Sequence, residues 1–302
     1  MYFYVAFFHA SPLAGQQAVE SARDCPQKRA NDTGTDERAM TSPNLHDFYG
    51  LKGRQVLITG AGGGIGQALI AAFTAAGAVV SGADRTDAAL ENLPLAHRLV
   101  FELTDRAGIA KAVGDFIGEN GAPDVLVNNA GFTRGETLDQ VDGDVWDREI
   151  AVNLNGAFHV TAPVVEAMAR RGSGNVVFIS SVNGLLHFGN PAYSAAKAGL
   201  ISYVKALAVE RGRYGIRANA VCPGSVRTPA WDHRLASQPE LLAKVLPHYP
   251  LGRMVTPEEV AHAVLFLASS AASGITGTAL AVDAGLTSGN LRFINDVLAG
   301  ED

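Results

Sequence analysis

The chain has 302 residues, of which 47% are hydrophobic and 18% charged, so it is long and apolar enough to bury a full core. Its formal net charge of −6 and the lack of a long Lys/Arg run argue against nucleic acid as a partner. The two cysteines, Cys25 and Cys222, share no metal or redox spacing, and the eight histidines form no H-E-x-x-H cluster. We therefore predict no metal, and free thiols in a reducing, cytoplasmic compartment.

The first 44 residues differ from the rest of the chain. The apolar start lacks the basic segment of a signal peptide and is broken by His9 and Pro12, and the stretch that follows is polar and without period. We predict a disordered extension over residues 1–44, with Met40 as an alternative start, and one domain over 45–302. No run reaches the ~18 apolar residues that a spanning helix needs, so we predict no membrane partner.

From Leu51 onward, short β-branched runs alternate with longer Ala-rich helical stretches. The apolar runs VLI, VLV and VVFI are typical of strands that are covered on both faces. This alternation predicts an α/β fold, namely a Rossmann-type doubly wound parallel sheet of about seven strands with helices on both faces. The predicted strands are Gln55–Thr59, Ala78–Gly82, Leu99–Leu103, Asp124–Asn128, Asn175–Ser180, Arg217–Cys222 and Ala279–Val282, and the predicted helices are Gly64–Ala76, Arg106–Asn120, Trp146–Arg170, Pro191–Gly212 and Pro257–Ser269.

A glycine-rich turn, GAGGGIG at 60–66, joins the first predicted strand to the first predicted helix. Such a turn lets the backbone approach a pyrophosphate, and the helix that follows offers free N–H groups and a favourable dipole. The spacing T-G-x-x-x-G-x-G, with Thr59, Gly60, Gly64 and Gly66, is not the usual G-x-G-x-x-G. It resembles the short-chain dehydrogenase/reductase family.

Two residues after the second predicted strand bear on the choice of dinucleotide. Asp84 can accept hydrogen bonds from an adenosine ribose and would repel a 2′-phosphate, which favours NAD. Arg85 could instead pair with a 2′-phosphate, so NADP stays as the less favoured alternative.

Tyr193 and Lys197 lie four positions apart, so they share one face of a helix. Asn190 can cap this helix and Pro191 suits its first position. Free tyrosine, with a pKa near ~10, is a poor base at neutral pH, and an adjacent ammonium lowers that pKa. The pair therefore predicts an acid–base unit for a substrate held beside nicotinamide.

The family resemblance implies two further catalytic residues. A serine that holds the substrate oxygen corresponds to Ser181, while the commoner family spacing would select Ser180. Alternation along a strand prevents both hydroxyls from facing the same cleft, and Ser181 is preferred. Asn153 matches the asparagine whose bound water links the lysine to solvent. The predicted catalytic residues are thus Asn153, Ser181, Tyr193 and Lys197.

The resemblance covers residues 51–288 and implies most of the cofactor contacts. Glu102-Leu103 stands where the family has Asp before an aliphatic residue near the adenine, Asn128 begins the N-N-A-G motif and matches the residue that stabilises the central sheet, and Pro223–Thr228 matches the segment that receives the carboxamide. The predicted dinucleotide-binding residues are Gly60, Gly63, Gly64, Ile65, Gly66, Asp84, Arg85, Glu102, Leu103, Asn129, Ala130, Gly131, Tyr193, Lys197, Pro223, Gly224, Val226 and Thr228.

We expect specificity to come from two segments, the loop 185–191 and a flexible lid over 230–250. Leu185, His187 and Trp231 are the candidate substrate-binding residues, and the lid also offers His233, Leu241 and Tyr249.

The predicted function is NAD-dependent interconversion of a small secondary alcohol (a polyol, sugar or cyclic alcohol) and its ketone. The alternatives are an NADPH-dependent ketone or 3-oxoacyl reductase, and a non-catalytic dinucleotide sensor. The resemblance also implies a homotetramer.

Overall fold

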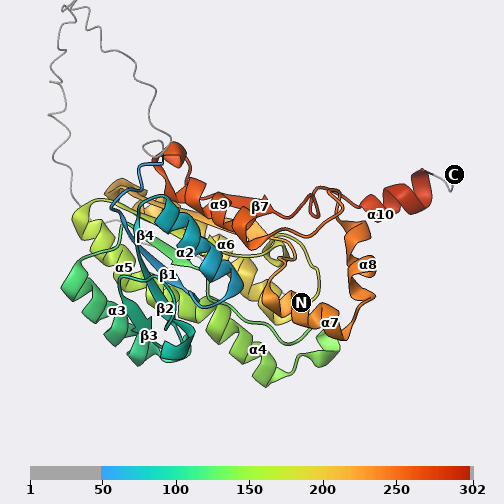
Figure 1. The fold of residues 1–302 in the computed structure, drawn as a ribbon, viewed down its shortest axis with the longest axis horizontal. Coiled ribbons are helices and arrows are strands. Elements are labelled where there is room, and N and C mark those ends of the chain that lie inside the picture. Colours follow the sequence, from blue (N-terminus) through green and yellow to red (C-terminus); the bar gives the residue numbers. More distant parts are fainter. Residues whose placement is uncertain (1–48, 300–302) are drawn as a thin grey trace, which may run out of the picture. The chain divides into compact units, whose positions relative to one another are not determined.

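The computed structural model describes residues 49–299, so the extension predicted over residues 1–44 lies outside the described part of the chain. The described residues form one seven-stranded parallel sheet with the strand order β3-β2-β1-β4-β5-β6-β7 (Figure 1). This confirms the predicted Rossmann-type fold in one domain. The strands are β1 (Gln55–Thr59), β2 (Val79–Asp84), β3 (Arg98–Val100), β4 (Val125–Asn128), β5 (Gly174–Ile179), β6 (Ile216–Pro223) and β7 (Ala279–Val282).

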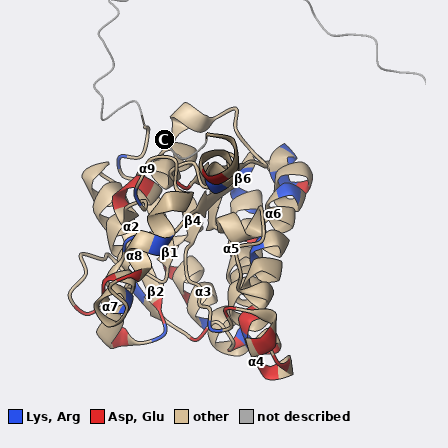
Figure 2. Cartoon of the chain, turned by 90° about the vertical axis from the view of Figure 1, so that its right-hand side faces the viewer, with Lys and Arg blue, Asp and Glu red and all other residues tan. Residues whose placement is uncertain are grey.

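Helices cover both faces of the sheet (Figure 2). One face packs against α2 (Gly64–Ala75) and α9 (Pro257–Ala268), and the other against α3 (Arg106–Asn120), α5 (Ala157–Arg171) and α6 (Pro191–Arg211). In β1, Val56 and Ile58 belong to the first core while Leu57 belongs to the second. Alternate side chains therefore enter opposite apolar layers, which is why the central strands read as continuous apolar runs.

The long helix predicted over residues 146–170 is not one regular α-helix. It consists of α4 (Gly143–Ile150), a π-helical segment over Ala151–Gly156, and α5. A π-helical turn inserts an extra residue between hydrogen-bonded partners and is common at functional sites, because it redirects side chains that a regular helix would place elsewhere. Asn153 lies within this segment.

Two other boundaries differ from the prediction. β3 ends at Val100, so Glu102 and Leu103 lie in the loop after the strand. The segment predicted as a flexible lid contains α7 (Pro229–Ser237), α8 (Leu241–Val245) and a 3₁₀ turn at 246–248. Thr228 and Pro229 occupy the N-cap and first positions of α7, a start signal that the prediction did not use.

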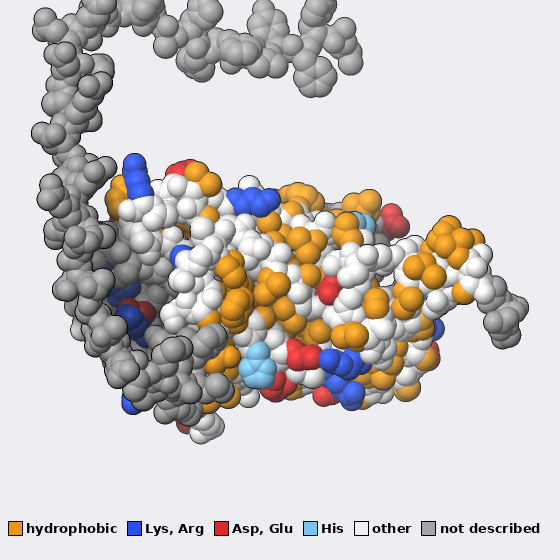
Figure 3. Space-filling model, turned by 90° about the horizontal axis from the view of Figure 1, so that it is seen from above, with side chains coloured by type: hydrophobic (Ala, Val, Ile, Leu, Met, Phe, Trp, Pro, Cys, Tyr) orange, Lys and Arg blue, Asp and Glu red, His pale blue; other side chains and the backbone are white. Residues whose placement is uncertain are grey.

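The chain ends in a projecting segment, α10 (Leu291–Phe293) with a π-helical turn at 294–298 (Figure 1). Apolar side chains gather on it (Figure 3), and Phe293, Ile294, Val297 and Leu298 are each at least 50% exposed. None of the helices within 49–299 has the length and apolar character needed to cross a membrane. The homotetramer stays a prediction.

The glycine turn yields a matched pair of substitutions. An added Cβ at Gly66 would overlap the carbonyl oxygen of Gly60 and lie 2.7 Å from that of Ala61, whereas one at Gly63 meets nothing closer than 3.4 Å. Since this backbone cannot easily shift, we expect Gly66→Ala to lower the free energy of unfolding by about 1–3 kcal/mol. Gly63→Ala, with φ −73°, should change it by less than about 0.5 kcal/mol. Denaturant unfolding of the two variants measures the difference, and equal stabilities would contradict the close packing.

Candidate active site

The glycine turn lies where the strand order reverses, between β1 and β4, at the carboxyl edge of the sheet. Gly60 has φ +64°, a left-handed conformation, and an added Cβ would lie 2.8 Å from the Cα of Ala130. Glycine is thus required here both by conformation and by the close approach of a second chain segment. The first turn of α2 carries no acidic side chain, so its N–H groups are available to an anion.

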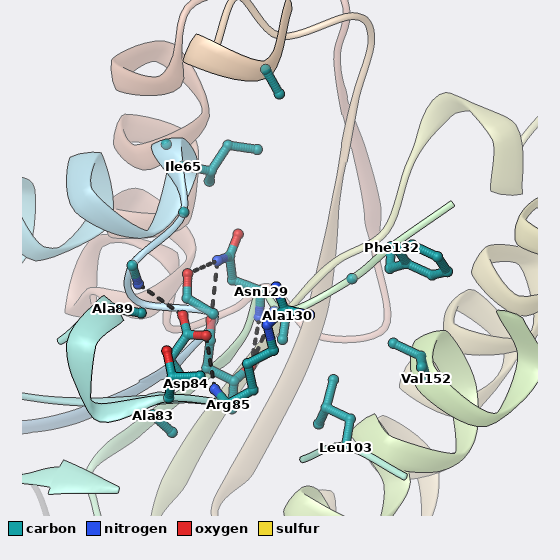
Figure 4. A pocket seen from close by; sticks show the side chains of 18 of the residues that line it. Ile65, Ala83, Asp84, Arg85, Ala89, Leu103, Asn129, Ala130, Phe132 and Val152 are labelled. Atoms are coloured by element: carbon teal, nitrogen blue, oxygen red, sulfur yellow. Dashed lines mark hydrogen bonds between the residues drawn. The ribbon is translucent and has the colours of Figure 1, made fainter. Parts of the chain in front are cut away.

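A cavity of about 860 Å³ opens beside this turn (Figure 4). It lies outside the carboxyl ends of the strands at the point where the strand order reverses, the usual ligand position in doubly wound sheets. Of the predicted dinucleotide-binding residues, those that line it are Gly60, Gly63, Gly64, Ile65, Asp84, Arg85, Glu102, Leu103, Asn129, Ala130, Gly131 and Thr228. The site combines a glycine cradle, a helix N-terminus and a carboxylate at the end of β2, and so fits a dinucleotide.

The other predicted cofactor residues lie outside this lining. Gly66 packs under the turn, and Val226 is buried in a parallel bridge with Val255. Pro223 ends β6, and an added Cβ at Gly224 would lie 3.2 Å from the Cα of Asp283 and 3.3 Å from the ring of Tyr249. Thr228 does reach the cavity, with its Cγ2 3.0 Å from the Cβ position of Gly64.

Asp84 is oriented by the backbone at the end of β2. Its Oδ2 accepts a hydrogen bond from Gly62 N at 3.0 Å, and its Oδ1 accepts one from Arg85 N at 2.8 Å. These bonds hold the half-buried carboxylate over the glycine turn (Figure 4). The side chain of Arg85 is exposed and borders the same cavity.

The carboxyl ends of β1 and β4 are joined by side chains. Thr59 Oγ1 accepts hydrogen bonds from the backbone N–H groups of Asn129 (3.0 Å) and Ala130 (3.1 Å), and Asn129 Nδ2 donates to the carbonyls of Thr59 and Gly60. Asn128 instead turns away from the cavity, and its Nδ2 donates to Thr161 Oγ1 on α5 at 2.8 Å. The asparagine that joins the central strands is therefore Asn129, whereas Asn128 fixes α5 to the sheet.

Ser181 and Tyr193 are brought together at the carboxyl end of β5. Burial raises the pKa of Tyr193 to about 12, a hydrogen bond with Ser181 opposes this rise, and the negative charge of Glu149 adds to it. Ser180 has a different partner, since its buried Oγ donates to the carbonyl of Lys197 at 2.9 Å. Ser181 Oγ itself accepts from Asn183 N at 3.1 Å and donates to Asn183 Oδ1 at 3.3 Å. Its influence on the pKa of Tyr193 favours Ser181 over Ser180 as the serine of the catalytic group.

Lys197 lies one helical turn after Tyr193 on α6. Its Nζ donates to the carbonyl of Ile179 at 2.8 Å, lies 5.3 Å from the centre of the Tyr193 ring, and is 3.3 Å from the Cβ position of Gly131. Burial lowers the pKa of Lys197 to about 8. Desolvation thus favours the neutral form of both side chains, and burial is the largest influence on the pKa of Tyr193. The expected lowering of that pKa by a protonated Lys197 stays a prediction.

Asn153 uses its side chain to hold the segment that follows β4. Its Oδ1 accepts from Phe132 N at 2.9 Å, and its Nδ2 donates to Phe132 O at 2.6 Å and to Glu149 O at 2.9 Å. The Cβ position of Gly131 is 3.0 Å from this Oδ1, close to the approach of Lys197 to the same glycine. Asn153 and Lys197 therefore both approach Gly131, a residue of the cavity wall.

Glu149 is a buried residue of this site that the sequence analysis missed. It is 1% exposed, and its Oε1 accepts from Thr133 Oγ1 (3.2 Å), Gly135 N (3.2 Å) and Arg134 N. Its Oε2 is buried without a hydrogen-bond partner. The i, i+4 spacing between Glu149 and Asn153 was the available signal, because it places both side chains on one helix face.

Asn190 joins the same segment to the start of α6. It occupies the N-cap position but does not cap the helix with its side chain, contrary to expectation. Its Nδ2 donates instead to Thr133 Oγ1 (3.2 Å) and Gly135 O (3.1 Å). The residues after β4 are therefore held both by the π-helical region and by the helix that carries Tyr193.

The candidate substrate-binding residues lie outside the lining of the cavity. Leu185 and His187 are exposed on the loop before α6, and Trp231 is half-buried on α7 under Arg234, whose guanidinium lies 5.4 Å from the ring centre. Tyr249 is 3% exposed and accepts a hydrogen bond from Ser225 N at 2.9 Å, so it supports the loop after β6 rather than lining a lid.

No cluster of His, Cys, Asp and Glu suited to a metal ion occurs within residues 49–299. Cys222 is a buried free thiol, and burial raises its pKa to about 11. Cys25 lies outside the described residues.

Glu149 gives a test with a defined sign. Because its charge raises the pKa of Tyr193, Glu149→Gln should lower that pKa and shift the rising limb of the pH–rate profile to lower pH. Glu149→Ala leaves two backbone N–H groups without their acceptor, and should lower the free energy of unfolding by about 2–4 kcal/mol. The measurements are pH–rate profiles and denaturant unfolding, with Glu166→Gln on the exposed side of α5 as control. An unshifted pH–rate profile in Glu149→Gln would contradict the effect of the Glu149 charge on the pKa of Tyr193.

Comparison with known proteins accords with this geometry. Residues 60–287 match a family described as enoyl-(acyl carrier protein) reductase. A 3-oxoacyl-[acyl-carrier-protein] reductase of Thermotoga maritima is 40% identical over 247 residues, which are 78% of this chain and 98% of that protein. An oxidoreductase of the short-chain dehydrogenase/reductase family from Burkholderia thailandensis has a TM-score of 0.76 and 43% identity, covering 83% of this chain and 99% of its own. A gluconate 5-dehydrogenase of Burkholderia cenocepacia, solved with NADP and tartrate, has a TM-score of 0.73 and 34% identity, covering 82% and 100%. The chain therefore belongs to the short-chain dehydrogenase/reductase family and is an oxidoreductase that acts on CH–OH groups.

Proposed function

We propose that this enzyme uses NAD to interconvert a small secondary alcohol and its ketone, with Tyr193 as the proton-transferring residue. The observation that carries the proposal is the position of Lys197, whose Nζ lies 5.3 Å from the centre of the Tyr193 ring and 3.3 Å from the Cβ position of Gly131. Gly131 lines the cavity that fits a dinucleotide, whereas Ser181, Tyr193 and Lys197 lie behind this wall and not in the lining itself. When bound, the nicotinamide supplies the acceptor or donor of hydride.

Each catalytic side chain has a separate task. Tyr193 takes the proton of the alcohol during oxidation and returns it during reduction. Ser181 Oγ, which donates to Asn183 Oδ1 at 3.3 Å in this structure, donates to the substrate oxygen as negative charge develops there. Lys197 stabilises the phenolate form of Tyr193 when protonated, and its pKa of about 8 lets its charge respond to the site near neutral pH.

Asn153 acts at the boundary of the site. Its side chain holds Phe132 at both backbone atoms, and so fixes the wall formed by Gly131 beside Lys197. In this proposal the carbonyl group of Asn153 holds a water molecule that carries the proton between Lys197 and solvent.

Asp84 supports NAD as the cofactor. A carboxylate held at the end of β2 can accept from both hydroxyls of an adenosine ribose and repels a 2′-phosphate. The second candidate is an NADPH-dependent 3-oxoacyl reductase. Arg85 borders the same cavity and could pair with a 2′-phosphate, and the Thermotoga maritima relative carries that reductase name.

Substitution of Tyr193 tests the chemical role. Tyr193→Phe keeps the ring and removes the proton donor, so we expect kcat to fall by about 10³-fold while NAD affinity stays within a few-fold. Any remaining oxidation should lose its rise with pH. Tyr203→Phe, ten residues along the same helix, is the control and should keep near-normal kcat. Substantial activity in Tyr193→Phe would reassign the proton transfer.

Substitution of Asp84 tests the cofactor. Wild-type turnover followed at 340 nm across a panel of alcohols, polyols and ketones should proceed with NAD(H) and be at least about tenfold slower with NADP(H). Asp84→Asn should weaken the binding of NAD and strengthen that of NADP, because the charge that repels a 2′-phosphate is lost. The ratio of the rate with NAD to the rate with NADP should therefore fall by about tenfold or more. Asp87→Asn, exposed three residues later, should leave the ratio unchanged. A wild-type preference for NADP that disappears in Arg85→Ala would favour the reductase candidate.

A further inference from the structure

Two arginines share one aromatic ring at the edge of the cavity. Arg134, in the segment after β4, has its guanidinium carbon 5.5 Å from the centre of the Phe132 ring. The guanidinium carbon of Arg148, on α4, lies 5.8 Å from the same ring centre. All three residues line the cavity that fits the dinucleotide. Contact with the ring limits the motion of each guanidinium while leaving its N–H edge open to an anion.

Within the part of the chain that the structure describes, neither guanidinium is paired with a carboxylate. Both side chains are exposed, and the ion pairs of residues 49–299 include neither of them. Asp144 stands one turn before Arg148 on α4, where a carboxylate could pair with it, but no such pair forms. Two unpaired positive charges thus stand together in a chain whose net charge is −6.

The ring that the arginines share is fixed to the catalytic residues. Asn153 binds both the N–H and the carbonyl of Phe132, and Glu149 binds the N–H of Arg134. Phe132 follows Gly131, whose Cβ position is 3.3 Å from Lys197 Nζ. The charges are therefore held at a set place relative to the proton-transferring group.

This place differs from the parts of the cavity suited to the dinucleotide phosphates. In Figure 4, Phe132 and Val152 lie on one side of the pocket, while Asp84, Arg85 and Ile65 lie on the other. A pyrophosphate would bind at the glycine turn beside Ile65, and a 2′-phosphate would lie beside Asp84 and Arg85. The arginine pair is left for a different anion.

We propose that Arg134, Arg148 and the Phe132 ring form an anion-binding subsite that receives a carboxylate or phosphate group of the substrate. The inference rests on the proposed function and narrows its substrates to hydroxy and oxo compounds that carry such a group. Two guanidinium groups can each donate paired hydrogen bonds to an oxyanion, which gives orientation as well as attraction.

The first test measures binding and requires no turnover. The full-length enzyme, saturated with its dinucleotide so that the glycine turn is filled, is titrated with inorganic phosphate by calorimetry. We expect saturable binding that weakens at high salt, because the arginines are exposed. The double variant Arg134→Ala/Arg148→Ala should weaken this binding by about tenfold or more. The control is Arg213→Ala, which removes an exposed arginine 4.8 Å from the Tyr214 ring and remote from the cavity lining.

The second test compares two ketones that differ in charge, acetoacetate and its methyl ester. The wild type should favour acetoacetate in kcat/KM, and the double variant should lose about tenfold or more of that preference, mainly through a higher KM for acetoacetate. If neither ketone reacts, this choice of substrate for the proposed function fails, and the phosphate titration alone decides the subsite. Phosphate binding and ketone preference both unchanged in the double variant would overturn the subsite. A loss of dinucleotide affinity in that variant would also overturn it, since the anion would then belong to the cofactor.

Discussion

The site depends on the close approach of β1 and β4 at their carboxyl ends. Thr59 and Asn129 join the two strands there. The chain leaves β1 through Gly60, which has a left-handed conformation and lies so close to Ala130 that a side chain at this position would overlap its backbone. The glycine turn and the N-N-A-G segment both start from this junction. Because the strand order reverses at the same place, helices cover opposite faces on its two sides and a cavity opens between them.

The segment after β4 connects this junction to the catalytic residues. Asn153 holds it from the π-helical segment, Glu149 holds it from the end of α4, and Asn190 holds it from the start of α6. Its backbone groups obtain their hydrogen bonds from buried polar side chains instead of from regular secondary structure. Displacement of this segment would therefore disturb the cavity wall and the tyrosine helix together, which makes Glu149 a positioning residue for the proposed chemistry.

Burial determines the acid–base properties of the proposed catalytic pair. It raises the pKa of Tyr193 to about 12 and lowers that of Lys197 to about 8. A tyrosine with this pKa holds its proton at neutral pH, as ketone reduction needs, while oxidation requires the phenolate and should accelerate as pH rises. The charge of Glu149 increases this bias, whereas the hydrogen bond from Ser181 opposes it.

The doubly wound sheet, the glycine turn and the Tyr193–Lys197 pair could all be predicted from the sequence, because strand alternation, helical periodicity and glycine requirements are local properties of the chain. Periodicity could not separate Ser180 from Ser181, because the two are adjacent and point to opposite faces at the end of a strand. The fold separates them, since the buried Ser180 hydroxyl donates to the carbonyl of Lys197 while Ser181 influences the pKa of Tyr193. Three further features are visible only in the folded chain: the π-helical turn, the hydrogen-bond partners of Glu149, and the contact of both Arg134 and Arg148 with the Phe132 ring. These features arise from contacts between separate segments, or from a helical irregularity without a local signature, so sequence periodicity does not reveal them.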